Sequence, residues 1–276
     1  MSGLLDHGLL DQWEGEPVTF WRNAWDIPAL EVHTRVGSTN DRALELAAEG
    51  RGSFTVVLAQ EQTAGRGRRG ASWHSPAGSG LWMSAVLPGP GPAPHLPLLV
   101  GLAVAEAVER AAGWTGSSAS AADDQGASGS ARLGIKWPND LFVGSKKVGG
   151  ILCESVADTV VAGIGLNVRS PAGGFPDGLG GVATTLEDEG IKSLSFSVLA
   201  GDIVRSLKER CQRPMAALSA EALAGLRARD ALVGRGVRTE ERGPGTAVRL
   251  DPDGALVLER ADGSRVRVTS GSVRPE

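Results

Sequence analysis

The stretch Ile135–Val168, IKWPNDLFVGSKKVGGILCESVADTVVAGIGLNV, gives the strongest indication of the fold. It contains three apolar runs, over 135–143, 148–154 and 159–168, which are separated by short polar or glycine-containing turns. Pro138 prevents regular strand pairing at one point of the first run, because proline has no backbone N–H. Successive strands joined by such tight turns predict an antiparallel meander.

Upstream of the meander, the sequence predicts two helices and two strands. The first helix begins at Ser38-Thr39-Asn40, whose short polar side chains cap a helix well, and it stops at Gly50. The clearest helix has alanine and leucine at helical spacing, with Glu106 and Glu109 on its other face. In chain order the helix, two strands and helix span residues 38–50, 54–59, 81–87 and 96–112.

Downstream, two helices are predicted over 197–210 and 219–230. From Val237 onward, short strands alternate with glycine- and proline-containing turns, which is typical of a small β-barrel. We therefore expect two domains, 1–232 and 233–276. Residues 115–131 are almost all Ser, Ala, Gly and Asp, so we expect a flexible surface insertion without a functional role.

The composition excludes several classes of protein. With 41% hydrophobic and 22% charged residues in 276, the chain has the composition of a globular protein. A formal net charge of -4 disfavours non-specific binding to nucleic acid or to anionic membranes. The N-terminus has no export signal and the longest apolar stretch is too short to span a membrane. The two cysteines, Cys153 and Cys211, suggest neither a metal site nor a disulfide framework, so we expect a cytoplasmic protein.

The segment Gly65–Gly70, GRGRRG, matches the GxGxxG pattern of dinucleotide-binding folds and follows a predicted strand. Two features exclude that interpretation. The glycines should open a helix, but 71–80 contains Pro76 and several small residues without an apolar period. The pattern also requires an acidic residue about 20 positions later, and 62–105 contains neither Asp nor Glu.

What remains is a glycine-rich loop with three arginines, Arg66, Arg68 and Arg69, and no carboxylate near them in the sequence. Arginine binds phosphate and carboxylate groups through paired hydrogen bonds, and glycine lets the backbone approach a ligand closely. The loop alone leaves three interpretations open: a lid that handles phosphate, a solvated basic loop, and a contact with nucleic acid.

Two further segments place polar groups where strands end. Lys136-Trp137-Pro138-Asn139-Asp140 has a lysine, an asparagine and an aspartate there, although a single lysine beside a turn more often faces solvent. In Gly163-Ile164-Gly165-Leu166-Asn167-Val168, the glycines indicate either a bulge or close packing. Asn167 then presents an amide that suits the edge of a nucleotide base.

Five segments in this order together resemble the biotin–protein ligase family: Ser38–Asn40, Gln62–Gly70, Lys136–Asp140, Lys147–Leu152 and Gly163–Val168. The resemblance covers about residues 30–170, and 236–273 resembles the family's C-terminal barrel more loosely. It implies an α+β fold of the class II synthetase-like biotin/lipoate ligase type. The central sheet would be mixed and largely antiparallel, with helices packed against it, and the small C-terminal barrel would be Src-homology-3-like.

The resemblance also implies a reaction in two steps. Biotin and ATP would form biotinyl-5'-AMP and pyrophosphate, and the biotinyl group would then pass to a lysine of a biotin carboxyl carrier domain of an acyl-CoA carboxylase. Mg²⁺ is expected with ATP as a phosphate-bound ion. No metal ligand is assigned; Asp140 is the one candidate considered.

The resemblance gives each matching position a role. The catalytic residues would be Lys136, Arg66 and Arg68, because joining a carboxylate to a phosphate brings two anions together and requires fixed positive charge. The residues expected to bind biotin are Ser38, Thr39, Asn40, Gln62, Arg66, Gly67, Arg68, Trp73, Lys136 and Gly149. Those expected to bind ATP and the adenylate are Gly65, Arg66, Arg68, Arg69, Trp73, Lys136, Asn139 and Asn167.

Two alternatives are kept. A lipoate–protein ligase would use the same chemistry, but the Ser38–Asn40 and Gln62 groups suit a ureido ring, which lipoate lacks. A non-enzymatic nucleic-acid-binding regulator is disfavoured by the sequence pI of about 5.7. Only about 35 residues precede Ser38, too few for the winged helix-turn-helix that many family members carry, so binding to DNA is not expected. We expect no membrane partner and a monomer or a weak homodimer.

Overall fold

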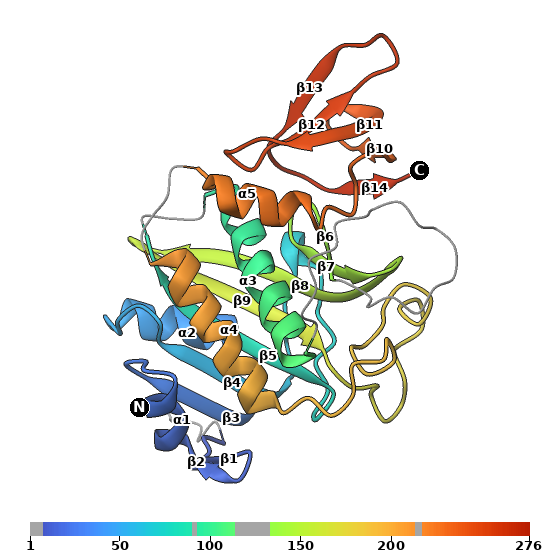
Figure 1. The fold of residues 1–276 in the computed structure, drawn as a ribbon. Helices are drawn as coiled ribbons and strands as arrows, with labels where there is room; N and C mark the ends of the chain where they lie inside the picture. The colour runs from blue at the N-terminus through green and yellow to red at the C-terminus, as the bar shows by residue number, and fades with distance from the viewer. Residues whose placement is uncertain (1–7, 90–92, 114–132, 213–216) are drawn as a thin grey trace.

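The computed structural model describes residues 8–89, 93–113, 133–212 and 217–276, and a seven-stranded sheet is its centre (Figure 1). The strand order is β3-β4-β5-β9-β8-β7-β6. The strands are β3 (Leu30–Val36), β4 (Val56–Gln62), β5 (Gly80–Pro88), β6 (Gly134–Lys136), β7 (Asp140–Val143), β8 (Lys146–Val156) and β9 (Thr159–Asn167). Only β3 and β4 pair in parallel, so the predicted α+β fold with a mixed, largely antiparallel sheet is confirmed.

Helices cover both faces of this sheet. Side chains of successive strand residues point to opposite faces, and the apolar residues divide accordingly. Val56, Leu58 and Ile164 join a core cluster with α3 (Leu96–Ala111) and α4 (Phe196–Cys211), whereas Val57 and Val161 join a small cluster with α2 (Thr39–Ala48). The α2 face therefore has room for a site beside the helix.

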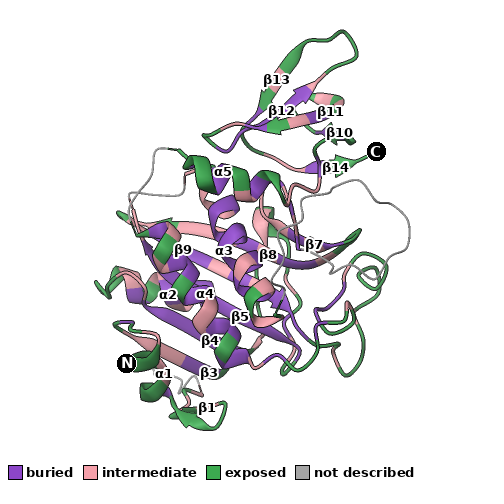
Figure 2. Ribbon diagram, in the orientation of Figure 1, coloured by how far each residue is buried: buried purple, intermediate pink, exposed green. Residues whose placement is uncertain are grey.

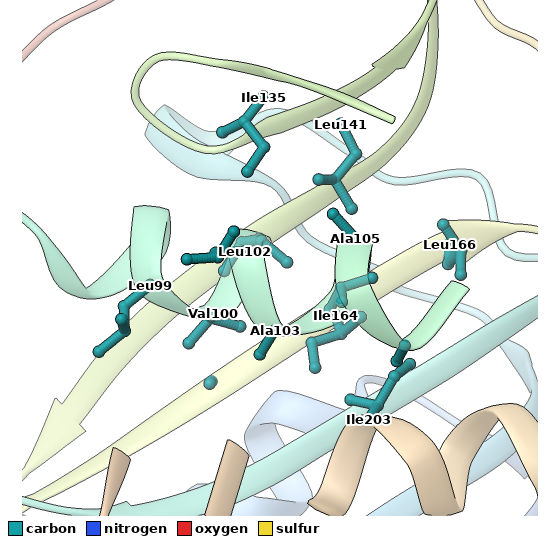
Figure 3. Close-up of a cluster of buried hydrophobic side chains, with 14 of the residues drawn as sticks. Leu99, Val100, Leu102, Ala103, Ala105, Ile135, Leu141, Ile164, Leu166 and Ile203 are labelled. Carbon is teal, nitrogen blue, oxygen red and sulfur yellow. The ribbon is translucent and has the colours of Figure 1, made fainter. Parts of the chain in front are cut away.

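The main hydrophobic core lies on the α3 face of the sheet. Figure 2 shows α3 and the strands beneath it largely buried. In Figure 3, side chains of α3 gather with Ile164 and Leu166 of β9, Ile135 and Leu141 of the β6–β7 hairpin and Ile203 of α4. Each such fully buried aliphatic side chain stabilises the fold by about 1.5–3 kcal/mol. The strands are thus held firmly by one face while the other carries polar groups.

The remaining elements lie at the two ends of the chain. A hairpin of β1 (Gln12–Trp13) and β2 (Glu16–Pro17) and the helix α1 (Val18–Ala24) precede the sheet, and sequence patterning did not predict them. Helix α5 (Ala220–Arg227) leads into five strands, β10 (Gly236–Thr239), β11 (Gly243–Leu250), β12 (Leu256–Glu259), β13 (Arg265–Val268) and β14 (Val273–Pro275). The predicted small barrel is a five-stranded antiparallel sheet with β13 and β14 at its edges.

Two further sequence expectations are corrected or fall outside the described residues. The run 135–143 is not one strand but the hairpin β6–β7, because Pro138 interrupts pairing and the chain reverses so that Lys136 lies opposite Asp140. The predicted insertion at 115–131 lies outside the described residues. The described part of the chain has no helix that is both long and apolar enough to cross a membrane.

An ion pair ties the start of α2 to the edge strand β3. Arg42 donates two hydrogen bonds to Glu31, from Nε to Oε2 at 2.8 Å and from Nη2 to Oε1 at 2.9 Å. His33 Nε2 lies 3.0 Å from the same carboxylate. Burial alone would raise the pKa of Glu31, but the hydrogen bonds and charges of Arg42 and His33 lower the pKa to about 2. The pair fixes the position of the preceding residues, Ser38–Asn40.

Replacing Glu31 by glutamine should lower the free energy of unfolding by about 1–3 kcal/mol at pH 7. The pKa of Glu31 in the folded state lies below its unfolded value, so its stabilisation is complete above about pH 4.5 and disappears as the pH falls towards about 2. Urea unfolding of both proteins at pH 7 and pH 3 measures this. A difference between them that is equally large at both pH values would contradict the assignment.

Candidate functional site

A cavity of about 410 Å³ opens on the α2 face of the sheet. Its walls come from the start of α2, the arginine-glycine loop 66–74, the β6–β7 hairpin, strands β8 and β9, and residues 175–183. The segment 271–274, which runs into β14 of the C-terminal sheet, closes one side. This size falls in the range of small-molecule sites, and the residues that line the cavity come from widely separated parts of the chain.

Glycines on the cavity face of β9 make room for large side chains from elsewhere. A Cβ on Gly163 would lie 2.3 Å from Asn40 Oδ1, and a Cβ on Gly165 would lie 2.5 Å from Trp73 Nε1. Gly150 on β8 faces the same indole ring, and a Cβ there would lie 3.2 Å from its Cζ3. Of the two interpretations that the sequence left open for Gly163 and Gly165, close packing is therefore correct.

One end of the cavity is a network of neutral hydrogen-bonding groups. The Thr39 backbone N–H and Oγ1 donate to Gln62 Oε1, at 2.9 and 3.1 Å. Gln62 Nε2 donates to Ser75 Oγ at 2.8 Å. Ser84 Oγ contacts both Thr39 Oγ1 and Asn40 Oδ1, at 2.8 and 2.7 Å. Such pre-ordered groups suit a ligand with a polar, uncharged ring.

The other end is strongly cationic. The described lining contains six cationic side chains and a single carboxylate, Asp140; the cations are Arg66, Arg68, Arg69, Lys136, Lys147 and Arg274. Lys147 Nζ pairs with Asp140 Oδ1 at 2.6 Å. This excess of positive charge indicates a site for a ligand that carries several negative charges.

Lys136 and Arg68 carry charge in this cavity without a carboxylate partner among the described residues. Arg68 Nη1 donates to Asn139 Oδ1 at 3.1 Å and to the Gly271 carbonyl at 3.3 Å. Burial lowers the pKa of Arg68, and burial also lowers the pKa of Lys136, which nearby Asp140 opposes. Burial destabilises the charged form of a cation that has no partner. A bound anion stabilises that charged form, so such cations favour the binding of an anion.

The sequence suggested a loop of three arginines without carboxylates nearby. In the structure, carboxylates that are distant in the sequence neutralise the other two loop arginines. Arg66 pairs with Glu154 of β8 and with Asp41 of α2. Arg69 Nη1 pairs with Glu240 Oε2 of the C-terminal sheet at 2.7 Å. The loop had appeared free of carboxylates because only neighbours in the sequence were visible.

The structure brings most of the predicted site residues together. Those in the cavity lining are Ser38, Thr39, Asn40, Gln62, Arg66, Gly67, Arg68, Arg69, Trp73, Lys136, Asn139 and Asn167. Gly65 and Gly149 are not in it. A Cβ on Gly149 would face Leu141 and Leu166 in the core, because Gly149 and Gly150 point to opposite faces of β8. Gly65 packs under the loop, where a Cβ would lie 2.6 Å from the Trp73 carbonyl oxygen.

Several lining residues escaped sequence reasoning. Lys147 lies in a motif that was noted, but no role was given to it; its Nζ is 5.1 Å from the centre of the Trp73 ring. Leu179, Val182 and Arg274 also line the cavity. Nothing in the sequence marks these three, because the loop 170–183 and the C-terminal sheet reach the cavity only through the tertiary fold.

Two protein-family models match the chain. The biotin/lipoate A/B protein ligase family matches residues 32–169, and the biotin protein ligase C-terminal domain matches residues 237–274. The first match contains all five segments on which the resemblance rests, and the second lies within the C-terminal sheet.

Curated relatives include ligases of two kinds. The biotin–[acetyl-CoA-carboxylase] ligase of Mycobacterium tuberculosis (strain H37Rv) is 34% identical over 255 residues, which is 88% of each protein. The bifunctional ligase/repressor BirA of Bacillus subtilis (strain 168) is 39% identical over 165 residues, 57% of this chain and 46% of the relative. The chain thus spans about half the length of the bifunctional relatives that it matches.

Solved structures resemble this one over most of its length. The biotin protein ligase from Aquifex aeolicus in complex with biotin and ATP has a TM-score of 0.72 and 26% identity, covering 91% of this chain and 100% of that chain. The biotin protein ligase from Leishmania major in complex with biotinyl-5-AMP has a TM-score of 0.58 and 30% identity, covering 88% and 99%.

Proposed function

The chain belongs to the biotin/lipoate A/B protein ligase family, and we propose that it is a biotin–protein ligase. It activates biotin with ATP and then transfers the biotinyl group to a lysine of an acceptor protein. The observation that carries this proposal is that one cavity combines a network of neutral hydrogen-bonding groups with Lys136 and Arg68, two cations that have no carboxylate partner among the described residues. A polar ring joined to a carboxylate and a nucleotide phosphate has the matching arrangement.

In the first step, a biotin carboxylate oxygen attacks the α-phosphorus of ATP, and the bond from that phosphorus to the pyrophosphate oxygen breaks. Two anions meet in this step, so the transition state needs positive charge that is already in position. Lys136 and Arg68 supply it, because neither is neutralised by a carboxylate of the described chain. The products are biotinyl-5'-AMP and pyrophosphate.

Ring recognition falls to the neutral end of the cavity. Thr39 and Gln62 are already bonded to each other, which fixes their orientation before a ligand arrives. Ser38 occupies the N-cap position of α2, yet its side chain makes no cap hydrogen bond to the helix. Its hydroxyl therefore suits a ureido group. A lipoyl ring, which has no such group, would leave these buried polar atoms unmatched.

Trp73, Asn139 and Asn167 complete the adenylate end in this proposal. The Trp73 indole lies over Gly165 of β9 and Gly150 of β8 and lines the cavity. Asn139 holds Arg68 and is itself held by Ile151, since its Nδ2 donates to the Ile151 carbonyl at 3.0 Å. Asn167 Nδ2 donates to the Thr184 carbonyl at 3.1 Å, which leaves its Oδ1 for an adenine amino group.

Mg²⁺ fits this site as an ion that enters with ATP. The described residues contain no cluster of three or more His, Cys, Asp or Glu side chains. Asp140, the one carboxylate of the lining, already pairs with Lys147. Mg²⁺ commonly binds through substrate phosphates and few protein groups, and it would neutralise phosphate charge here.

In the second step, the amine of an acceptor lysine attacks the carbonyl carbon of the mixed anhydride, AMP leaves, and an amide bond forms. The acceptor is a biotin carboxyl carrier domain of an acyl-CoA carboxylase, as the name of the M. tuberculosis relative suggests. The arginine-glycine loop covers the anhydride until that lysine arrives, which limits hydrolysis by water.

The test is exchange of labelled pyrophosphate into ATP, with biotin or lipoate as the acid. We expect exchange that depends on biotin, and a mass gain of one biotinyl group on a carrier domain incubated with the protein, ATP, Mg²⁺ and biotin. Faster exchange with lipoate would assign the chain to the lipoate branch of the family. Absence of exchange with both acids would overturn the adenylation mechanism.

A further inference from the structure

We infer that Glu154 is a positioning residue that holds Arg66 at the rim of the cavity and links it to the ring-binding end through Asn40. The inference rests on the proposed function for the identity of the ligand. The contacts of Glu154 are all with other residues of this chain, so they do not depend on which ligand binds. They involve a carboxylate outside the cavity lining, so Glu154 acts through other residues rather than on the substrate.

Glu154 and Arg66 form a two-pronged ion pair between strand β8 and the loop. Arg66 Nη1 donates to Glu154 Oε1 at 2.9 Å, and Arg66 Nη2 donates to Glu154 Oε2 at 2.8 Å. Arg66 Nη2 also donates to Asp41 Oδ1 at 2.5 Å. A planar guanidinium held at both ends in this way has one orientation, unlike the loosely paired arginines of most surfaces.

The Glu154 carboxylate also accepts a hydrogen bond from Asn40, which is part of the network at the ring-binding end. Asn40 Nδ2 donates to Glu154 Oε2 at 2.8 Å, and Asn40 Oδ1 accepts from Ser84 Oγ at 2.7 Å. Ser84 Oγ also lies 2.8 Å from Thr39 Oγ1, whose hydroxyl can donate to it, while the Thr39 backbone N–H donates to Gln62 Oε1. A continuous chain of hydrogen bonds therefore runs from the loop arginine to the groups that receive the acid's ring.

Strand geometry makes this chain of contacts possible. Glu154 is on the same face of β8 as Gly150, because residues two apart share a face. Asn40 reaches Glu154 only because Gly163, on the neighbouring strand, has no side chain: a Cβ there would lie 2.3 Å from Asn40 Oδ1. Asn40 is 4% exposed, so its amide cannot exchange these partners for water without cost.

A consequence for the loop follows from the charges. With Arg66 paired to Glu154 and Asp41, Arg69 to Glu240 and Lys147 to Asp140, the lining cations without a carboxylate partner among the described residues are Arg68, Lys136 and Arg274. Loss of Glu154 should therefore weaken binding of the acid and loosen the loop, while the rate of the chemical step changes less. We expect a larger effect on the KM for biotin than on kcat.

The test compares Glu154→Gln, Arg66→Lys and the double variant in two measurements. Biotin binding without ATP is followed by calorimetry, and the rate of tryptic cleavage of the loop is followed by mass spectrometry. Each single variant should bind biotin about tenfold more weakly, as expected for a lost charged hydrogen bond, and the double variant no more weakly than either. Cleavage of the loop should be several-fold faster in Glu154→Gln.

Glu259→Gln is the matched control, because Glu259 pairs with Arg265 on the exposed β12–β13 hairpin. It should leave both measurements unchanged. Biotin affinity of Glu154→Gln within twofold of wild type, or single losses that multiply in the double variant, would overturn the inference. If Glu154→Gln does not fold, Glu154→Asp, which keeps the charge but shortens the side chain, decides by the same criteria.

The two proposals can fail separately. If the wild-type protein does not bind biotin, the proposed function fails, and the cleavage rates alone then decide the role of Glu154. Faster cleavage in Glu154→Gln than in wild type and Glu259→Gln would support it as the residue that holds the loop. Equal cleavage in all three proteins would contradict it.

Discussion

Replacing Lys136 by alanine should reduce the rate of biotin-dependent pyrophosphate exchange by about 10²–10³-fold, the usual cost of removing one fixed group that stabilises charge in a transition state. Lys136 is at the end of β6, opposite Asp140, and makes no ion pair within the described residues. Its ammonium contacts a phenyl face instead, 5.3 Å from the centre of the Phe142 ring. Since the side chain is not part of the apolar core, the fold should survive the substitution.

The measurement is the steady-state exchange rate, with the melting temperature as a check of folding. Lys146→Ala is the control, because Lys146 is an exposed lysine near the start of β8 and is absent from the cavity lining. It should retain wild-type exchange. Exchange by Lys136→Ala within tenfold of wild type would remove the central cation from the mechanism.

We also expect the rate of pyrophosphate exchange to depend on pH through Lys136. Burial lowers the pKa of Lys136 below that of an ordinary lysine, and Asp140 opposes this shift only in part. The cationic form is the active one, so exchange should decline on the alkaline side at a lower pH than an ordinary lysine would give. Lys136→Arg should remove this decline within the measurable range, because arginine stays protonated. An alkaline limb that is identical in both proteins would assign it to another group.

Much of the sheet could be predicted from the sequence because its strands show their environment locally. The runs over 148–154 and 159–168 are apolar, bounded by turn residues and long enough for strands. The α3 helix was evident because alanine and leucine recur at helical spacing, with Glu106 and Glu109 on the other face. Elements with a clear apolar period are the ones that local patterns describe well.

The N-terminal elements were missed for different reasons. In strand β3, Leu30, Val32 and Val36 alternate with Glu31, His33 and Arg35, which is the period of a half-buried strand, so a local signal was present and was overlooked. Its pairing partner in parallel, β4, is separated from it by a whole helix. Helix α1 is only 7 residues long, and its stability comes from packing rather than from a repeating apolar face.

The residues of the site also differ in how far the sequence could predict them. Lys136 and Arg68 could be predicted because lysine and arginine in a motif suggest an anion whatever the fold. The neutralisation of Arg66 and Arg69 could not, because Glu154 and Glu240 lie 88 and 171 residues away in the sequence. Charge at a residue is a property of the sequence, but the field at a site depends on which distant carboxylates the fold brings near it.

Gly165→Ala should weaken biotin binding by roughly 10- to 100-fold, because a single methyl group removes the place that the Trp73 indole occupies. The added Cβ would lie 2.5 Å from Trp73 Nε1 and 2.6 Å from its Cε2, which is closer than a Cβ approaches non-bonded atoms. The other edge of the indole lies over Gly150 of β8, where an added Cβ would come within 3.2 Å of Cζ3. Trp73 must therefore leave the wall of the cavity, and the loop that carries it must move.

The indole already shows that this position serves more than packing. Trp73 Nε1 is the one buried side-chain nitrogen or oxygen in the described structure that has no hydrogen-bond partner. A buried N–H left unpaired costs about 1–3 kcal/mol, so this one calls for a partner such as a bound ligand. A change at Gly165 should therefore affect ligand binding more than it affects stability.

Calorimetric titration with biotin and thermal unfolding of Gly165→Ala separate these two effects. Gly52→Ala is the control, because its Cβ would meet nothing closer than Pro28 Cγ at 4.0 Å, and it should bind as wild type does. The double variant Gly165→Ala with Trp73→Phe places a smaller ring opposite the new methyl group, so it should regain part of the stability lost by Gly165→Ala. Wild-type biotin affinity in Gly165→Ala would show that the ring position does not shape the site.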